Sequence, residues 1–170
     1  GVKIAVRPFG DVPRGVLEDL AEDLASLGTV ELLDANPLPR EWFDQERGQY
    51  RADAFLDALG SDSGHRVLGV TTEEIYAEPY RFVFGQARIQ GRPAILSLAR
   101  LTTTDPSRTR DRVAKEAIHE LGHTLGLHHC ENRGCVMTFS NSVEEVDRKT
   151  RMFCRRCQVT VDFMLKRLRT

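Results

Sequence analysis

The stretch from His119 to Cys157 constrains this chain more than any other part, because it gathers the residue types that bind metal ions. Of the 170 residues, it holds four of the five histidines and all four cysteines. Histidine and cysteine clusters at short spacings are typical of metal sites. We therefore expect the rest of the chain to form a scaffold that positions these side chains.

His119, Glu120 and His123 form the pattern H-E-x-x-H. Residues four apart in an α-helix lie one turn apart on the same face, so both imidazoles can bind one metal ion. Glu120 follows about 100° around the helix, where its carboxylate can accept a proton from a water bound to that ion. The short pattern also occurs by chance. In that case its three residues would be a surface histidine, a glutamate in a helix salt bridge and a core histidine.

The pattern extends to H-E-x-x-H-x-x-G-x-x-H, with Gly126 and His129 at its last fixed positions. In a continuous helix His129 would lie about 280° around from His119 and would point away from the ion. The chain is therefore expected to leave the helix after His123, at Gly126, because glycine adopts left-handed conformations without a Cβ penalty. Three imidazoles plus water would complete a catalytic zinc site. His128 competes as third ligand, but it follows Gly126 one position too early.

The four cysteines form two close pairs, Cys130 with Cys135 and Cys154 with Cys157. This spacing favours a tetrahedral zinc site with four thiolate ligands. Two disulfides, four unrelated thiols and an iron–sulfur cluster are the alternatives. Several cations surround the second pair and could offset the negative charge of such a site, or simply form a solvated basic face: Arg148, Lys149, Arg151, Arg155 and Arg156.

Together these motifs resemble the archaemetzincins, small zinc peptidases with a metzincin-type catalytic site and a second zinc site of four cysteines. The match runs from His119 through Cys130, Cys135 and Met137 to the later C-x-x-C, about a quarter of the chain. The segment Phe82–Ala87 also resembles the family's pattern.

The resemblance implies two zinc ions per chain and a role for each residue of the motif. It implies a catalytic zinc bound by His119, His123 and His129, with Glu120 as general base. It implies a structural zinc bound by Cys130, Cys135, Cys154 and Cys157.

Met137 would be the Met-turn methionine, again by resemblance. Physically, a polarisable thioether would give the three imidazoles a dry floor, although an ordinary core methionine would look the same in the sequence. Some metzincins carry a tyrosine ligand two residues later. Phe139 occupies that position here and has no hydroxyl, which argues against a tyrosine-switch mechanism.

Length and composition indicate one globular domain, residues 1–170. The net charge of −1 gives no overall attraction to nucleic acid or to anionic membranes. No apolar run is long enough to span a bilayer, and no signal sequence is evident. We therefore expect a cytoplasmic protein that binds neither nucleic acid nor membranes.

Apolar periodicity predicts alternating strands and helices. Strands are expected at residues 2–6, 30–33, 66–70, 82–84 and 94–98. Helices are expected from Pro13 to Gly28, from Ala52 to Gly60, from Asp105-Pro106 to about Leu125, from Val143 after a capping box at Ser142, and from Val159 to Leu168.

This order predicts an α/β, zincin-like fold: a mixed, mostly parallel sheet packed on helices, with a central zinc-binding helix. Residues 1–127 would form an N-terminal subdomain with the sheet and the active-site helix. Residues 128–170 would form a small helical subdomain with the third histidine, the Met-turn and the four-cysteine zinc site. By resemblance, an edge strand should bind the substrate backbone, either 92–100 or the strand at Phe82.

We expect a zinc-dependent metallopeptidase that acts on a peptide or protein through a zinc-activated water and a glutamate general base. The alternative is a zinc-stabilised binding module with a vestigial or blocked peptidase site. Its basic C-terminal residues, Lys166, Arg167 and Arg169, would then serve a partner or nucleic acid. Neither the substrate nor the oligomeric state follows from the sequence.

Overall fold

The main sheet has five strands in the order β2-β1-β5-β8-β7. In this computed structural model, which describes all 170 residues, the strands are β1 (Lys3–Phe9), β2 (Thr29–Leu32), β5 (Arg66–Thr71), β7 (Gly85–Ala87) and β8 (Pro93–Ser97). Neighbouring strands are parallel except for β7, which is antiparallel to β8. The predicted mixed, mostly parallel α/β sheet is confirmed.

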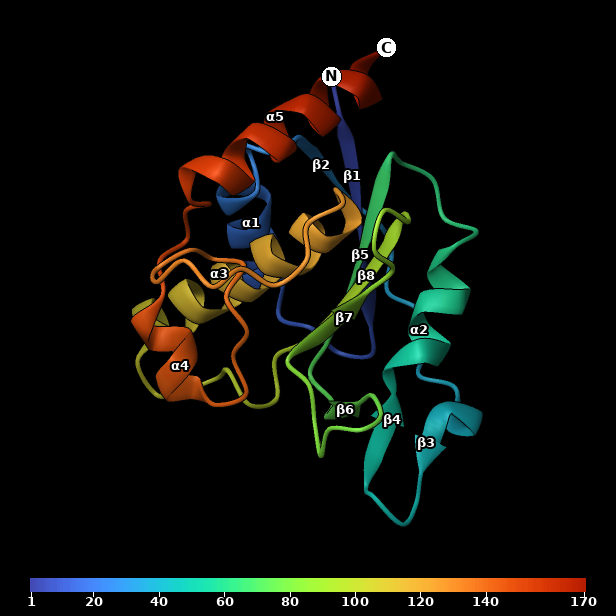
Figure 1. Cartoon of the computed structure of the whole chain (residues 1–170). Coiled ribbons are helices and arrows are strands. Elements are labelled where there is room, and N and C mark those ends of the chain that lie inside the picture. Colours follow the sequence, from blue (N-terminus) through green and yellow to red (C-terminus); the bar gives the residue numbers. More distant parts are fainter.

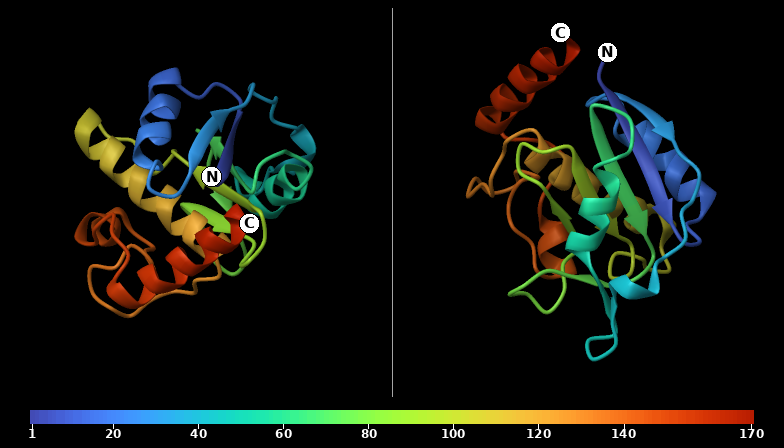
Figure 2. Two further views of the ribbon diagram at one scale, coloured as in Figure 1. Left: turned by 90° about the horizontal axis from the view of Figure 1, so that it is seen from above. Right: turned by 90° about the vertical axis from the view of Figure 1, so that its right-hand side faces the viewer.

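Helices cover both faces of this sheet (Figures 1 and 2). On one face lie α1 (Arg14–Asp23), α3 (Pro106–Thr124) and α5 (Arg155–Arg169), with the short α4 (Val143–Arg148) beyond them. On the other face lies α2 (Ala52–Leu59). Both views in Figure 2 place the two chain termini near each other, beside the end of α5.

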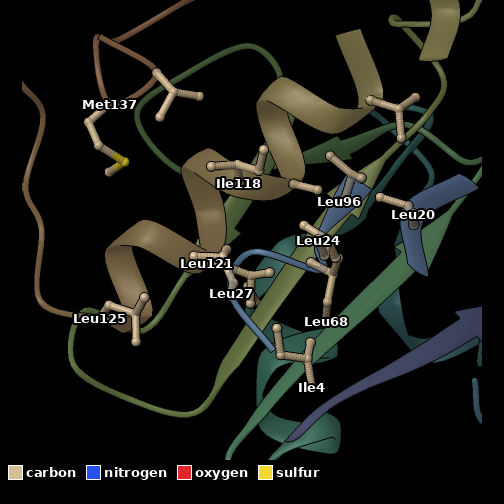
Figure 3. Close-up of a cluster of buried hydrophobic side chains, with 14 of the residues drawn as sticks. Ile4, Leu20, Leu24, Leu27, Leu68, Leu96, Ile118, Leu121, Leu125 and Met137 are labelled. Atoms are coloured by element: carbon tan, nitrogen blue, oxygen red, sulfur yellow. The ribbon is translucent and has the colours of Figure 1, made fainter. Parts of the chain in front are cut away.

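The larger core lies between the sheet and the long helix α3. Leu68 and Leu96 of the sheet face Ile118 and Leu121 of α3, and all four are buried (Figure 3). Each apolar side chain removed from water stabilises the fold by roughly 1.5–3 kcal/mol. The predicted central, buried position of α3 is therefore confirmed, and this packing fixes the helix relative to the sheet.

A second, three-stranded sheet was not predicted. It consists of β3 (Phe43–Asp44), β4 (Gln49–Arg51) and β6 (Ile75–Tyr76), preceded by the 3-10 turn η1 (Arg40–Trp42). Strands of two or three residues are too short to show an alternating pattern. Aromatic packing of Trp42 on Phe9 and Phe55 joins this region to the main sheet.

Two helix boundaries differ from the prediction. The helix α1 ends at Asp23, although Leu24 and Leu27 stay buried in the turns that follow. Gly28 does not end it. A Cβ there would lie 2.6 Å from the carbonyl oxygen of Val2, so Gly28 allows close approach to β1. At the other end of the chain, α5 starts directly after Cys154 and not at Val159, so the C-x-x-C segment itself forms its first turn.

The strand predicted at 82–84 was placed too early in the chain, because β7 begins only at Gly85. The Val83 N–H donates instead to the carbonyl of Ile75, so this apolar run connects the small sheet with the main one. The two edge strands of the main sheet are β2 and β7, and β7 is the one that lines the cleft described below. The candidate edge at 92–100 was wrong, because β8 is paired on both sides, with β5 and β7.

The remaining helix boundaries agree with the prediction. Asp105 caps α3, and its Oδ1 accepts from the N–H groups of Ser107 and Arg108. Ser142 caps α4 by accepting from the N–H of Glu145. The division of the chain into subdomains between residues 127 and 128 stays a prediction. The helices α4 and α5 and all four cysteines do come after this point in the chain. None of the helices has the length and apolarity that crossing a membrane requires.

Candidate active site and cysteine cluster

The last two turns of α3 carry His119, Glu120 and His123, all buried. The helix then ends in a Schellman motif, in which the N–H of Leu127 donates to the carbonyl of Gly122 at 3.1 Å. Gly126 has a φ of +95°, the left-handed conformation expected of the glycine in this motif. The predicted break is therefore confirmed. It turns the chain back over the helix.

This reversal brings His129 to the other two imidazoles. The ligand atoms of His119, His123 and His129 all lie within 4.8 Å of one another, whereas His128 is outside this group. The ring of His129 stacks on that of His119 with centroids 5.3 Å apart. The structure thus brings together the three histidines of the extended pattern.

The histidine atoms fit a tetrahedral zinc ion. The Nε2 atoms of His119 and His123 are 3.2 Å apart. Zn–N bonds of roughly 2.0–2.1 Å at tetrahedral angles place two nitrogens about 3.3 Å apart. The Nδ1 atoms lie 2.8 Å from the carbonyl of Val136 and 2.7 Å from that of Leu127. These carbonyls favour a proton on Nδ1, which leaves each Nε2 lone pair free for a metal.

Burial keeps these imidazoles neutral. It lowers the pKa of His119 well below its ordinary value and that of His123 to about 4. Burial also lowers the pKa of the more exposed His129. Neutral imidazoles are the form that binds metals, so the histidine cluster is ready to bind zinc at neutral pH.

Glu120 reaches the same cleft from the adjacent helix position and is only 4% exposed. Burial, together with the nearby Glu116 carboxylate, raises the pKa of Glu120 well above its ordinary value. A metal dication in the site would oppose this shift and favour the carboxylate. A buried carboxyl with a perturbed pKa beside a metal site is suited to proton transfer.

Gly85 on β7 makes room for Glu120, a contact that sequence reasoning missed. A Cβ at Gly85 would lie 2.6 Å from Cγ and 2.8 Å from Oε2 of Glu120. It would also lie 2.7 Å from the carbonyl oxygen of Ile95. The edge strand can therefore approach the carboxylate this closely only without a side chain at residue 85. The signal was available, since Gly85 lies within the segment Phe82–Ala87.

The cleft around these groups has a volume of about 210 Å³, and apolar side chains form part of its wall. The wall includes Tyr80, Phe82, Ala87, Ile89 and Phe139. Phe139 contacts His129 with ring centroids 5.1 Å apart, in the position where a tyrosine would be needed for ligation. Ser140 also lines the cleft, and its hydroxyl is buried without a hydrogen-bond partner in the chain.

Met137 lies completely buried against α3, close to the turns that carry the histidines (Figure 3). A Cβ at Gly122 would lie 2.5 Å from its sulfur, so the glycine lets the thioether pack directly on the helix backbone. The position of Met137 as a floor beneath the imidazoles, and its role as Met-turn, stay predictions.

Lys149 was grouped in the sequence with the cations around the cysteines, and that interpretation was wrong. Its side chain is 2% exposed and forms an ion pair with Glu116, with Nζ 2.9 Å from Oε2. The contact is an ion pair without a well-oriented hydrogen bond at Oε2. Arg151 likewise pairs elsewhere, with Asp111 and Asp23. Burial of Glu116 and Lys149 was not visible in the sequence, because their proximity depends on the tertiary fold.

The four cysteines come together near the start of α5, with all four sulfurs within 4.8 Å of one another. They are free thiols, and the sulfurs of Cys130 and Cys154 are 3.9 Å apart. Zn–S bonds of roughly 2.3 Å at tetrahedral angles place sulfurs about 3.8 Å apart, whereas a disulfide requires about 2.05 Å. The two-disulfide alternative does not fit this structure.

Backbone N–H groups point at the sulfurs. The N–H groups of Asn132 and Cys154 lie 3.3 Å from the sulfurs of Cys130 and Cys135, respectively. A backbone hydrogen bond from Cys157 lowers the pKa of Cys154 to about 6, while burial raises the pKa values of Cys135 and Cys157. A bound cation would favour the thiolate at all four positions.

Comparison with known proteins identifies close relatives of this chain. The model of peptidase family M54 matches residues 36–162. The archaemetzincin of Methanopyrus kandleri is 53% identical over 132 residues, 76% of this chain and 75% of the relative. That of Archaeoglobus fulgidus is 44% identical over 158 residues, 92% of this chain and 96% of the relative.

Solved structures match equally well. The crystal structure of the Methanopyrus kandleri archaemetzincin matches with a TM-score of 0.90 and 44% identity, over 97% of this chain and 96% of that one. The Archaeoglobus fulgidus structure, complexed with malonate, has a TM-score of 0.87 and 43% identity, over 93% and 99% of the two chains. The described fold is therefore shared along nearly the whole chain.

Proposed function

The chain belongs to peptidase family M54 and is a zinc metallopeptidase, and from this premise we propose that Glu120 is its general base. His119, His123 and His129 would hold the catalytic zinc through Nε2, as the fit of their atoms supports. Zinc at this site would supply a Lewis acid that makes water more acidic and polarises a peptide carbonyl.

Residues of the chain orient the imidazoles, transfer the proton and line the cleft. Val136 and Leu127 hold the two helical imidazoles in the tautomer that exposes Nε2. Glu120 accepts the proton of the attacking water and returns it to the leaving nitrogen. The apolar wall around the cleft limits access of bulk water, which strengthens electrostatic interactions inside.

The substrate is a peptide or protein that lies in extended conformation along β7. This strand is paired only with β8, so its outer edge offers backbone groups to a further strand. The apolar wall can receive an adjacent aliphatic or aromatic side chain.

A second zinc, bound by the four cysteines, gives two ions per chain in this proposal. The closed sulfur cluster would leave no open position for substrate, which is the property of a structural site. It would link the segment that carries His129 and Met137 to the start of α5. The second ion would therefore support the catalytic centre mechanically.

The proposal depends above all on the convergence of the three histidines with Glu120 in one cleft. The test compares wild type with Glu120→Ala, using a mixture of peptides and elemental zinc analysis. The variant should retain its zinc and lose hydrolysis, and the wild-type activity should disappear with a chelator and return with zinc.

Equal activity in the Glu120→Ala variant would refute the role of Glu120. If zinc-loaded wild type hydrolyses no peptide while both ions are bound, the binding-module alternative gains support.

A further inference from the structure

A buried lysine lies directly behind one of the candidate zinc ligands. The Nζ of Lys149 is 2.9 Å from Glu116 Oε2, 3.1 Å from the Thr138 carbonyl oxygen and 3.5 Å from His119 Nδ1. Metal-binding histidines commonly place this nitrogen against a carboxylate or a carbonyl. Here the Val136 carbonyl takes that place, but the Lys149 ammonium also lies beside the ring nitrogen.

The ammonium does not serve as a hydrogen-bond partner of the ring. His119 Nδ1 is only 2.8 Å from the carbonyl of Val136, so its proton is used there. An N–H on the ring and an ammonium are both donors, and neither can accept from the other. The remaining interaction between Lys149 and His119 is therefore electrostatic, between a positive charge and a ring that donates electron density to a metal.

Within the ion pair, the ammonium is the group that contacts the His119 ring, at 3.5 Å from Nδ1. After burial, the Lys149 charge is the next cause that lowers the pKa of His119 and of His129. The Glu116 charge instead acts on Glu120, whose pKa it raises. The geometry thus places the positive charge directly behind His119, while the carboxylate that holds it lines the cleft.

We propose that Lys149 weakens zinc binding at the histidine site, and that Glu116 restrains this effect by holding the ammonium in its ion pair. A cation beside a ligand repels the incoming metal ion and draws electron density from the imidazole. The histidine site therefore exchanges its ion readily and holds a more electrophilic one, while the cysteine site retains its zinc. This inference rests on the proposed function only in requiring that the three histidines bind the ion.

The test measures zinc affinity and not activity. Protein with one zinc retained at the cysteines is titrated with zinc against a competing chelator at fixed pH, and a His123→Ala variant confirms that the second equivalent binds at the histidines. The main variant is the double substitution Lys149→Met with Glu116→Gln. It replaces both charges, because a lone buried carboxylate would itself attract zinc and because breaking one half of a buried pair destabilises the fold.

The double variant should bind the second zinc at least about tenfold more tightly than wild type, since even part of a Coulomb interaction at this range corresponds to such a factor. Glu116→Gln alone leaves the lysine without its counter-charge and should bind more weakly. Lys149→Arg keeps the charge and should resemble wild type. A purely structural role for the pair predicts weaker binding in every variant.

Unchanged or weaker binding in the folded double variant overturns the inference. If the double variant does not keep its cysteine-bound zinc, the Glu116→Gln variant is the deciding measurement. Zinc binding at its histidine site that is equal to wild type or tighter overturns the inference. If wild type takes up no second zinc, the histidine site itself fails, and with it both this inference and the proposed function. If instead the sites bind zinc as expected but hydrolyse nothing, only the peptidase proposal is affected.

Discussion

Replacing Gly85 by alanine tests how the edge strand and Glu120, the proposed general base, depend on each other. The new Cβ would lie 2.6 Å from Glu120 Cγ, 2.8 Å from Glu120 Oε2 and 2.7 Å from the carbonyl oxygen of Ile95. Ordinary van der Waals contact begins near 3.4 Å, so the carboxylate side chain has to move by about 1 Å. The Ile95 carbonyl is backbone of the paired strand β8 and moves less easily.

The substitution is expected to lower both activity and stability. A misplacement of about 1 Å in a catalytic centre can lower the rate by roughly 100-fold. Overpacking by one methyl group costs about 1–3 kcal/mol of stability, a decrease in Tm of several degrees for a domain of this size. We therefore expect kcat in Gly85→Ala to fall by about two orders of magnitude in protein that is still folded and still binds zinc.

The assay is peptide hydrolysis at saturating zinc, with thermal unfolding of the same samples. Gly15→Ala is the matched control, because nothing lies within 4 Å of a Cβ at this position on α1. That substitution should leave kcat unchanged and increase stability slightly, by about 0.5–1 kcal/mol. Wild-type kcat and KM in folded Gly85→Ala would refute the argument that Gly85 positions the Glu120 carboxylate.

Three further substitutions test other parts of the structure. Arg66→Met removes two guanidinium hydrogen bonds to the Thr124 carbonyl at the end of α3. It should lower the free energy of unfolding by about 2 kcal/mol, which thermal unfolding would show as a decreased Tm. An unchanged Tm would contradict this. The hydrogen bonds from Arg112 lower the pKa of Asp147, so their stabilisation is complete above the unfolded value of about 4 and is lost as pH falls through the lower folded pKa. Asp147→Asn should therefore be less stable than wild type at pH 7 and depend less on pH in acid, as denaturant unfolding at several pH values would show; equal slopes would contradict it. Cys135→Ser should lose one zinc equivalent in elemental analysis and reduce helical circular dichroism, whereas full zinc content would argue against the cysteine site.

The sequence predicted the helix α3 well because all of its signals are local. Asp105 supplies the cap, the H-E-x-x-H spacing places two imidazoles on one face, and Gly126 ends the helix. Each of these depends on residues within a few positions along the chain. The β-α alternation that gave the parallel sheet was equally visible, since its elements are long enough to show a period.

Short or non-local features were predicted poorly. The strand expected at 82–84 begins only at Gly85, and the small sheet of β3, β4 and β6 was missed altogether. Backbone pairing between distant segments decides these elements, and two or three residues do not show a period. The same limit explains why β7, and not residues 92–100, forms the edge beside the cleft.

What the sequence determined by itself is the chemistry: the identities and spacings of the histidines, Glu120 and the cysteines, which the fold gathers into two clusters. What only the tertiary structure decided is the environment of those groups. Lys149 is paired with Glu116 behind His119, and Gly85 lies against Glu120. Burial, charge and close approach arise between segments far apart in the chain, and no pattern within one segment encodes them.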